Sequence, residues 1–505
     1  MHKNLTILSL ATLLLCGCFG TGFDKYEPED GPLIIGGIEI DSLRLCHAID
    51  SIINADHDTL PADKALRSYY AETHQLNWIS NDGVTPQADT LLAHIGSVGE
   101  CGFSKDDFLV DKIADDKLRV DSTDFTEKDV YELVARMDYQ MTKAFMRYIG
   151  GQHYGFVNPY KVLNRLDRNK HDTVNVVYRQ QYDVPTEVIG SEGYRHLAEI
   201  AGTDSVEHVL RDAEPKSALY QRLKQMLPGT DGNRRRQILV NMERCRWRHP
   251  HYPTDFSKYV VVNIPSMQLT AVDADSIVEM RIVCGSRDTK TPLVSSNIMR
   301  MDLNPKWMVP ASVIKHEMAH HAGDSAYFAR HRYVITDRKT GDRYNPRHVT
   351  REMMETASVR VAQEGGDGNA LGRIIFRFAN NFSIFLHHTS NVSAFSRADR
   401  CLSHGCIRVE RPFDLAAFLL EDKDEERLEN IRYTMEYRTP PPSDTEAEKP
   451  DRSRILNSVK VSPEIPLFIT YYTMYLTPDG TMREYPDVYG YDTAIYKKLA
   501  AFTER

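Results

Sequence analysis

The chain has 505 residues, with 62 Lys and Arg against 71 Asp and Glu, so its formal net charge is −9. This length predicts two or three domains at about 150 residues each, and 41% hydrophobic residues exclude wholesale disorder. A mildly acidic chain lacks the basic balance that binding to nucleic acid needs, so no nucleic acid is expected as a partner. Eight cysteines are too few for a disulfide scaffold in so long a chain.

The N-terminus resembles a bacterial lipoprotein signal. Residues 1–17 combine Lys3 with an apolar stretch too short to span a bilayer comfortably, as in a signal peptide. The stretch ends in Leu-Cys-Gly-Cys, which is similar to a lipobox with Cys18 as the lipidated residue; two incidental cysteines after a secretory signal are the alternative. We expect a membrane anchor at Cys18, a polar tether over 18–41, and a periplasm-facing or outer-membrane lipoprotein of the cell envelope.

Residues 42–250 are predicted to form a mainly helical domain. Between 130 and 148, apolar residues recur at three- and four-residue spacing, and Gly150-Gly151 is expected to stop that helix. A second helical stretch ends before Pro228-Gly229. Because this half carries no catalytic motif, we interpret it as a scaffold.

Residues 251–505 are rich in strand patterns, in which β-branched and alternating apolar residues dominate. A charged segment over about 311–368 interrupts them and is predicted to be a mainly helical insertion. The fold class is therefore α+β. The strand candidates are 259–264, 267–271, 277–283, 374–378, 383–386 and 467–475.

One short segment carries a pattern typical of nucleophilic catalysis. A cysteine nucleophile needs a base that forms the thiolate and N–H donors for the oxyanion. Gly405 lets the backbone turn tightly beside Cys406, and His387 lies at the end of an apolar strand. Arg408 would point to the same side as Cys406 and hold a substrate carboxylate or a structural partner. The predicted catalytic residues are Cys406 and His387, and the predicted oxyanion or substrate-binding residues are Ser403, His404, Gly405, Arg408 and Thr389.

The other cysteines show no comparable pattern. A free cysteine is usually a small core residue. We assign that role to Cys46, Cys101, Cys245 and Cys284. Cys401 lies in the same loop as Cys406, and its role stays open.

The spacing His387-x-Thr389 followed by Ser403-His-Gly-Cys-Ile-Arg408 resembles the signature of the L,D-transpeptidase catalytic domain family. The helical half, with Trp78, is similar to the scaffold domain of the large periplasmic members. This resemblance implies a mixed β-sandwich-like catalytic domain over 251–505, a lid over 311–368, and no cofactor. Further segments that resemble those members are Asn241–Arg244, Arg246-Trp247, Tyr259–Pro265, Thr291-Pro292, Asn304–Pro310, Asn369–Gly372 and Asp487–Asp492.

The resemblance also implies a reaction. The Cys406 thiolate would attack the L,D peptide bond of a peptidoglycan tetrapeptide stem, release D-alanine and hold the acyl group as a thioester. His387 would take the thiol proton and later deprotonate the acceptor amine. An amine of a second stem gives a 3→3 cross-link, and water gives carboxypeptidase activity. Carbapenems typically acylate the cysteine of this family.

Two features depart from the family pattern. The repeat pattern of a peptidoglycan-binding module is absent, so glycan docking by such a module is not expected. His388 stands where this subgroup commonly has Asp, which leaves His388 as a minor alternative to His387 as the base.

A competing motif predicts a different enzyme. His316-Glu317-x-x-His320 matches H-E-x-x-H, in which two histidines on one helix face bind zinc and the glutamate acts as base. The alternative function is therefore a zinc metallopeptidase. Ala326 occupies the position of the third metzincin ligand, so we predict no metal. A catalytically inactive wall-binding lipoprotein is a third alternative, disfavoured by the intact Cys406, His387 and Arg408.

Overall fold

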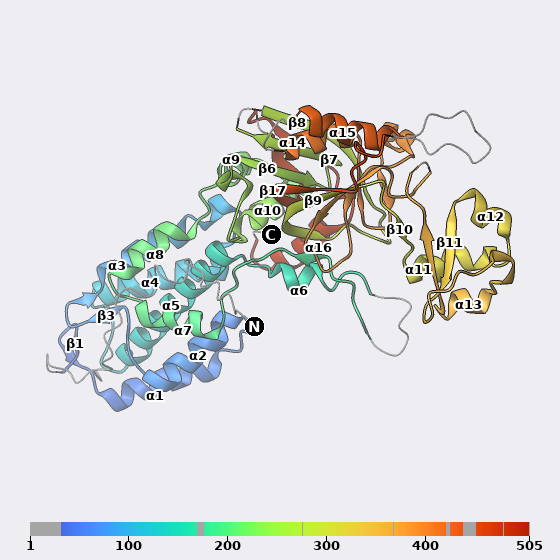
Figure 1. The fold of residues 1–505 in the computed structure, drawn as a ribbon. Helices are drawn as coiled ribbons and strands as arrows, with labels where there is room; N and C mark the ends of the chain where they lie inside the picture. The colour runs from blue at the N-terminus through green and yellow to red at the C-terminus, as the bar shows by residue number, and fades with distance from the viewer. Residues whose placement is uncertain are drawn as a thin grey trace, which may run out of the picture.

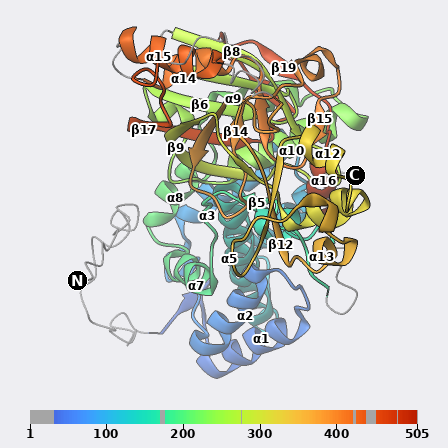
Figure 2. The same cartoon turned by 45° about the vertical axis from the view of Figure 1, so that its right-hand side comes forward.

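A helical body and a β-rich body follow each other along the chain, and a lid projects from the second (Figures 1 and 2). The predicted signal peptide and Cys18 lie outside the described residues. Among the described residues, no helix is long and apolar enough to cross a membrane. The computed structural model describes residues 32–168, 176–274, 276–366, 368–420, 425–437, 451–477 and 479–503.

The helical body is built around α5 (Val130–Tyr154), which is buried along most of its length. Apolar side chains at helical spacing bury the inner faces of the surrounding helices against it. Two hairpins, β1 (Ile34–Ile35) with β2 (Ile38–Glu39) and β3 (Ile79–Ser80) with β4 (Gly83–Val84), lie at its outer end. The other helices are α1 (Ser42–Ala55), α2 (Pro61–Thr73), α3 (Pro86–Gly96), α4 (Val110–Asp121), α6 (Pro159–Leu163), α7 (Ser191–Ile200), α8 (Ser205–Ala213), α9 (Ala218–Met226) and α10 (Gly232–Arg246).

The expectation that Gly150-Gly151 stops the central helix is wrong. Helix α5 continues to Tyr154, and it ends at Gly155, whose φ is +89°. Both inner glycines are buried, and a Cβ at Gly150 would come within 2.7 Å of the Tyr194 hydroxyl. A Cβ at Gly151 would lie 2.1 Å from the Phe156 ring. These glycines therefore allow close packing inside the helix rather than ending it.

The β-rich body is one sheet that closes on itself. Strand β13 pairs with β14 on one side and with β9 on the other, so the order β13-β14-β16-β8-β7-β6-β17-β9 returns to its start. Strand β15 pairs with β8, and β5 (Tyr182–Asp183) from the first body pairs with β9. The strands are β6 (Lys258–Asn263), β7 (Gln268–Asp273), β8 (Ser276–Gly285), β9 (Leu293–Leu303), β13 (Ile374–Phe378), β14 (Leu386–His387), β15 (Cys401–Ser403), β16 (Ile407–Val409) and β17 (Ser458–Thr470).

Three helices and a hairpin complete this body. Helices α14 and α15 cover the outer end of the sheet, and α16 lies on the side of the scaffold (Figure 1). These elements are α14 (Pro412–Leu419), α15 (Glu425–Glu436), α16 (Tyr491–Leu499), β18 (Met474–Leu476) and β19 (Met482–Glu484).

The lid carries the short helices that the sequence predicts and, in addition, a small sheet that the sequence analysis did not predict. Short helices stand beside a three-stranded antiparallel sheet of order β10-β12-β11, and Phe328, Ile335 and Met354 belong to a core of its own. The alternating residues of Val359–Gln363 bury one face of the central strand, a period-two pattern that favours a strand. The elements are β10 (Trp307–Met308), α11 (Ala311–Val313), α12 (Ser325–Arg330), β11 (Tyr333–Asp337), α13 (Arg351–Glu355) and β12 (Val359–Gln363).

Helix α10 joins the two bodies through buried polar contacts. Asn241 donates from its side-chain amide to the Thr473 hydroxyl at 2.7 Å, and Arg244 lies 2.6 Å from Asp492. Both partners belong to the C-terminal part of the chain. The sheet and the scaffold are therefore tied by specific hydrogen bonds as well as by apolar packing.

A buried carboxyl in the scaffold predicts a pH-dependent stability. Asp138 is fully buried and accepts from the Tyr70 hydroxyl at 2.5 Å and from the backbone N–H of Trp78 at 2.7 Å. Burial outweighs these hydrogen bonds and raises the pKa of Asp138 to about 6. The folded state then holds this proton more tightly than the unfolded state, so the contribution to stability grows as the pH falls through 6.

We expect the wild type to gain about 1 kcal/mol between pH 7 and pH 5 relative to Asp138→Asn. Urea denaturation of both proteins at pH 7, 6 and 5 measures this difference. If the free energies of unfolding of the two proteins changed equally with pH, the raised pKa of Asp138 would be contradicted.

Candidate active site

Cys406 lies at the end of a tight turn between β15 and β16. Ser403 holds this turn: its hydroxyl donates to the Cys406 carbonyl at 2.5 Å and accepts from the Gly405 N–H at 3.1 Å. Gly405 has a φ of +116°, which disfavours any residue with a side chain. Ser403 and Gly405 are thus placed as turn-forming residues beside the nucleophile.

The turn leaves one backbone donor free at the cysteine. The Gly405 N–H is used by Ser403, whereas within the described part of the chain the Cys406 N–H has no acceptor. Such an amide is available for the oxyanion of a tetrahedral intermediate. The cysteine itself is half-buried, and burial raises the pKa of its thiol. A protonated thiol at neutral pH needs a base before it can attack.

His387 lies on the same face of the sheet as Cys406. Strands β14 and β16 are parallel, with His387 opposite Arg408, and Arg408 is two residues beyond Cys406. Because side chains alternate between the faces of a strand, the three side chains share one side. The His387 ring is buried, and burial lowers its pKa to about 4, so the imidazole is neutral at pH 7.

A hydrogen bond selects the tautomer of His387. Its Nδ1 lies 2.6 Å from the carbonyl oxygen of His388, which can only accept, so Nδ1 carries the proton. Nε2 is then unprotonated and can accept a proton, and a second backbone hydrogen bond, to Leu371, also acts on the ring. The backbone at position 388, whatever its side chain, thus orients the candidate base.

The His388 side chain is held in a different way. Its Nδ1 accepts from the Arg373 N–H at 3.0 Å, which places its own proton on Nε2. The ring packs against Gly372, where a Cβ would come within 2.6 Å of Nδ1. His388 therefore has no free lone pair with which to act as base. It lines a hollow of about 220 Å³ together with Thr389, Ser390, Val392, Gly366, Gly368, Asn369, Gly372 and Arg373.

The Arg408 guanidinium has no carboxylate partner among the described residues. Its Nε is buried and has no hydrogen-bond partner among the described residues, and no ion pair to it is present there. Burial lowers the pKa of the guanidinium, as expected for a buried cation without an anionic partner. Arg408 is therefore placed to receive an anion on the face that Cys406 and His387 share.

The structure adds supporting residues that motif reasoning did not assign to the site. The Thr291 hydroxyl donates to the Gly405 carbonyl at 2.8 Å and accepts from the Gly285 N–H at 2.8 Å. The Tyr489 hydroxyl donates to the Gly285 carbonyl at 2.6 Å. Thr291 and Tyr489 lie in segments that resembled the family, and that resemblance was the only sequence signal for them.

The H-E-x-x-H segment does not form a zinc-binding helix face. Ile314–Met318 is a π-helical turn and Ala319–His321 a 3₁₀ turn, so His316 and His320 lack the α-helical register that puts i and i+4 on one face. Among the described residues, no group of three or more His, Cys, Asp and Glu side chains could hold a metal. Glu317 instead lies 3.0 Å from Nε2 of His404, so the lid touches the cysteine turn there.

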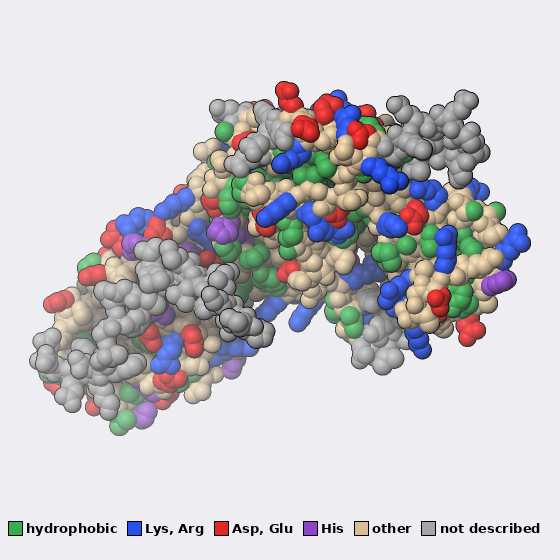
Figure 3. Space-filling view, viewed as in Figure 1, with side chains coloured by type: hydrophobic (Ala, Val, Ile, Leu, Met, Phe, Trp, Pro, Cys, Tyr) green, Lys and Arg blue, Asp and Glu red, His purple; other side chains and the backbone are tan. Residues whose placement is uncertain are grey.

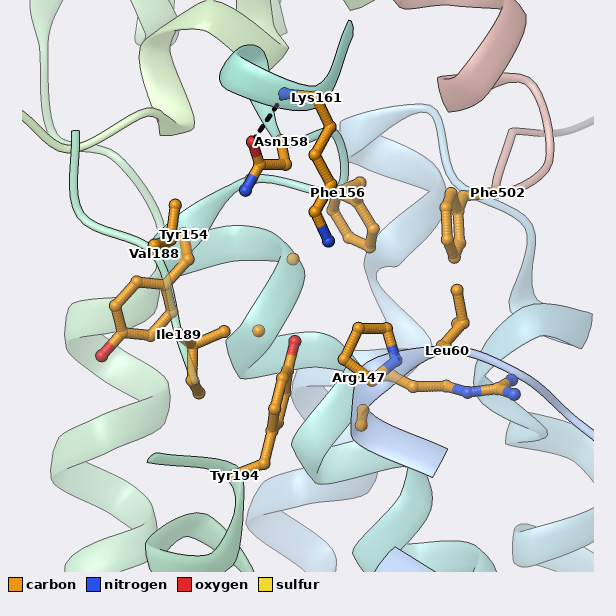
Figure 4. Close-up of a pocket in the computed structure, with 15 residues that line it drawn as sticks. Leu60, Arg147, Tyr154, Phe156, Asn158, Lys161, Val188, Ile189, Tyr194 and Phe502 are labelled. Atoms are coloured by element: carbon orange, nitrogen blue, oxygen red, sulfur yellow. Dashed lines mark hydrogen bonds between the residues drawn. The ribbon is translucent and has the colours of Figure 1, made fainter. Parts of the chain in front are cut away.

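A second hollow, of about 150 Å³, lies between the scaffold and the C-terminal end of the chain (Figure 4). Arg147, Tyr194 and Phe502 line it, and Arg147 is already paired with Asp63 at 2.8 Å. None of the predicted site residues lines this hollow. It is separate from the candidate active site.

A half-buried cysteine, a neutral histidine of fixed tautomer and a backbone amide without an acceptor among the described residues lie together in this α+β protein. Comparison with known proteins gives the family of each body. Residues 64–227 match the family described as the scaffold domain, and residues 257–431 match the L,D-transpeptidase catalytic domain. The second body therefore belongs to the L,D-transpeptidase catalytic domain family and is preceded by a scaffold domain.

One curated relative matches about half of the chain. Over 285 residues the chain is 29% identical to a Haemophilus influenzae protein named "Putative L,D-transpeptidase". The match covers 55% of this chain and 53% of that protein, so the chain spans about half the length of the curated relative.

Proposed function

We propose that the protein is a peptidoglycan L,D-transpeptidase that uses Cys406 as nucleophile and His387 as base. Nε2 of His387 takes the thiol proton, and the thiolate attacks the L,D peptide bond of a tetrapeptide stem. The bond to D-alanine breaks, D-alanine leaves with a proton, and the stem remains as a thioester on Cys406. An amine of a second stem, deprotonated by His387, then takes the acyl group and forms a 3→3 cross-link. Water as acceptor gives L,D-carboxypeptidase activity.

The observation that carries this proposal is the fixed tautomer of His387 on the same strand face as Cys406. The Cys406 N–H is available to the oxyanion, and the unpaired Arg408 suits a carboxylate of the stem. No step requires a cofactor. On the face shown in Figure 3, basic side chains are interspersed with acidic ones, so that face lacks the continuous basic patch that a nucleic-acid backbone needs.

We further propose that Cys18 is lipidated and anchors the enzyme in the cell envelope, facing the periplasm or in the outer membrane. The motif at residues 1–18 supports this location, as does the need to reach cell-wall stems. Incorporation of radiolabelled palmitate in wild type but not in Cys18→Ala tests the anchor. Equal labelling of both proteins would overturn it.

Carbapenem labelling tests the nucleophile directly. Intact-protein mass spectrometry after incubation with a carbapenem should show one adduct per chain, which peptide mapping places on Cys406. Incubation with purified tetrapeptide muropeptides should give D-alanine and 3→3 cross-linked dimers. An adduct elsewhere, or no turnover of any tetrapeptide stem, would overturn the proposal.

Variants of the three neighbouring histidines separate their roles. We expect His387→Ala to lose turnover nearly completely, because His387 lies on the strand face that Cys406 shares and its Nδ1 hydrogen bond leaves Nε2 unprotonated. His388→Asp should keep substantial activity, since only its backbone carbonyl orients His387. His404→Ala should be intermediate, because its exposed ring lies 3.0 Å from the lid residue Glu317 and not on the strand face of Cys406 and His387.

The measurement is the rate of thiol alkylation against pH for each variant, together with turnover. In the wild type the base-assisted rate should fall near pH 4, where His387 becomes protonated. A fast-alkylating, active His387→Ala together with an inactive His388→Ala would instead assign the base to His388.

The zinc alternative makes a different prediction. If Glu317 is a lid contact, transpeptidation should survive EDTA, and purified protein should carry far less than one zinc per chain. Glu317→Gln should change KM more than kcat, because it weakens the contact between the lid and His404. Stoichiometric zinc with peptidase activity lost in Glu317→Gln would establish the metallopeptidase.

A further inference from the structure

Two buried cysteines face each other at the base of the candidate active site. Cys284 and Cys401 are paired directly across the parallel strands β8 and β15, and their Sγ atoms lie 3.7 Å apart. Cys284 is fully buried and Cys401 is 4% exposed. No other pair among the described cysteines is in contact.

The backbone positions suit a covalent bond. Directly paired residues on neighbouring strands have Cα atoms about 5 Å apart, which lies within the range seen for disulfides. An S–S bond is about 2.0 Å long, so the two sulfur atoms must approach by roughly 1.7 Å. Small side-chain rotations can supply this shift. β15 is a three-residue strand that, among the described strands, pairs with β8 alone, so it has few backbone hydrogen bonds that resist a small movement.

The pair lies directly under the turn that carries the nucleophile. Gly285 follows Cys284, and Ser403 lies two residues after Cys401; these positions pair across the same strands. The Ser286 N–H donates to the Ser403 carbonyl at 2.8 Å. Ser403 in turn holds the Cys406 carbonyl. A bond between Cys284 and Cys401 therefore fixes strand β8 to strand β15, which leads into the Cys406 turn.

The chemistry of the two thiols is asymmetric. The contact between the two thiols lowers the pKa of Cys284 and, with Asp399 nearby, raises the pKa of Cys401. Cys284 is accordingly the thiol that ionises first, and Cys401 keeps its proton until the second step.

We propose that Cys284 and Cys401 are a redox-active pair that closes to a disulfide and locks the β8–β15 base of the Cys406 turn. The oxidant is a small-molecule or protein disulfide that reaches the pair during folding, before the two thiols are buried. The Cys284 thiolate attacks one sulfur of the oxidant, whose S–S bond breaks and releases one thiol. Cys401 then loses its proton, attacks Cys284 and releases the second thiol. Two S–H bonds are exchanged for one S–S bond, while the oxidant disulfide is reduced to two thiols.

Peptide mapping of the full chain tests the pairing. Reduced wild-type protein is unfolded in urea, refolded with glutathione disulfide and glutathione, quenched with iodoacetamide and digested for mass spectrometry. We expect a Cys284–Cys401 linked peptide in most molecules and Cys406 outside any intramolecular disulfide. Recovery of both Cys284 and Cys401 in the alkylated form, or with other partners, would overturn the proposal.

Thermal unfolding tests the locking role. Oxidised wild type should melt roughly 5 °C or more above the reduced protein, because the bond closes a loop of over one hundred residues. Cys46→Ala, a half-buried cysteine in α1, should keep this difference, whereas Cys284→Ala and Cys401→Ala should each lose it. A linked peptide without any change in melting temperature would refute the lock. Since mapping needs no variant, the pairing is tested even if an alanine variant fails to fold.

Discussion

Cys406→Ala is expected to abolish both cross-linking and carbapenem acylation. The proposed reaction passes through a thioester intermediate, and alanine removes the Cys406 sulfur that forms it. Structure should be retained, because Cys406 is half-buried and the turn is held by Ser403, Gly405 and Thr291 rather than by the thiol. The measurements are 3→3 dimer formation from tetrapeptide muropeptides and intact mass after drug treatment.

Cys46→Ala is the matched control, since it removes a half-buried thiol from the scaffold helix α1. It should leave both readouts at the wild-type level. Thioester formation at the wild-type level in Cys406→Ala would refute Cys406 as nucleophile. Unchanged melting of Cys406→Ala shows that its loss of activity is chemical rather than structural.

Arg246→Met is expected to destabilise the protein by about 3–5 kcal/mol, the cost typical of removing one partner from a buried ion pair. Arg246 is fully buried; it donates to Gln152 at 2.8 Å and to the Tyr220 hydroxyl at 3.1 Å. Its guanidinium lies 3.5 Å from Glu243, which is also fully buried. Burial raises the pKa of Glu243 to about 7 even with Arg246 present. Removing the cation raises that pKa further, so the loss should grow as the pH rises above 7.

Urea denaturation at pH 6 and pH 8 measures both effects. Arg211→Met is the control, because Arg211 is an exposed cation whose ion pair within the described ranges, to Glu207, is 3.9 Å long. It should change stability by less than about 0.5 kcal/mol. A similarly small change in Arg246→Met would show that the buried cluster does not stabilise the scaffold.

Local sequence patterns determined the elements that a single chain segment specifies. The spacing of apolar residues predicted the first part of α5, and the β-rich runs predicted β6, β7, β8 and β13 within a few residues. The α+β class followed from these patterns. The Ser-His-Gly-Cys motif identified the turn at Cys406 because its residues are contiguous and its geometry is local.

Long-range packing decided what these patterns left open. Gly150 and Gly151 look like a helix stop in the sequence. In the structure the Tyr194 ring, from a distant helix, packs on Gly150, and the Phe156 ring, just past the helix end, packs on Gly151. The glycines make room for these rings, and the helix continues. The lid contains a sheet because strands that are far apart in the sequence pair with each other, as Tyr333 does with Gln363. The charge composition of the segment gives no information about this pairing.

The active-site environment likewise depends on residues far apart in sequence. The carbonyl of His388 fixes the His387 tautomer, but His388 loses its own lone pair to Arg373, fifteen positions earlier. Nothing in the sequence relates Cys284 to Cys401. In the structure, pairing of strands β8 and β15 places their sulfur atoms 3.7 Å apart. The sequence by itself determined which residues can react and which segments form elements. Only the tertiary structure decided protonation, pairing and burial, because these depend on the distance and dielectric surroundings that chain closure creates.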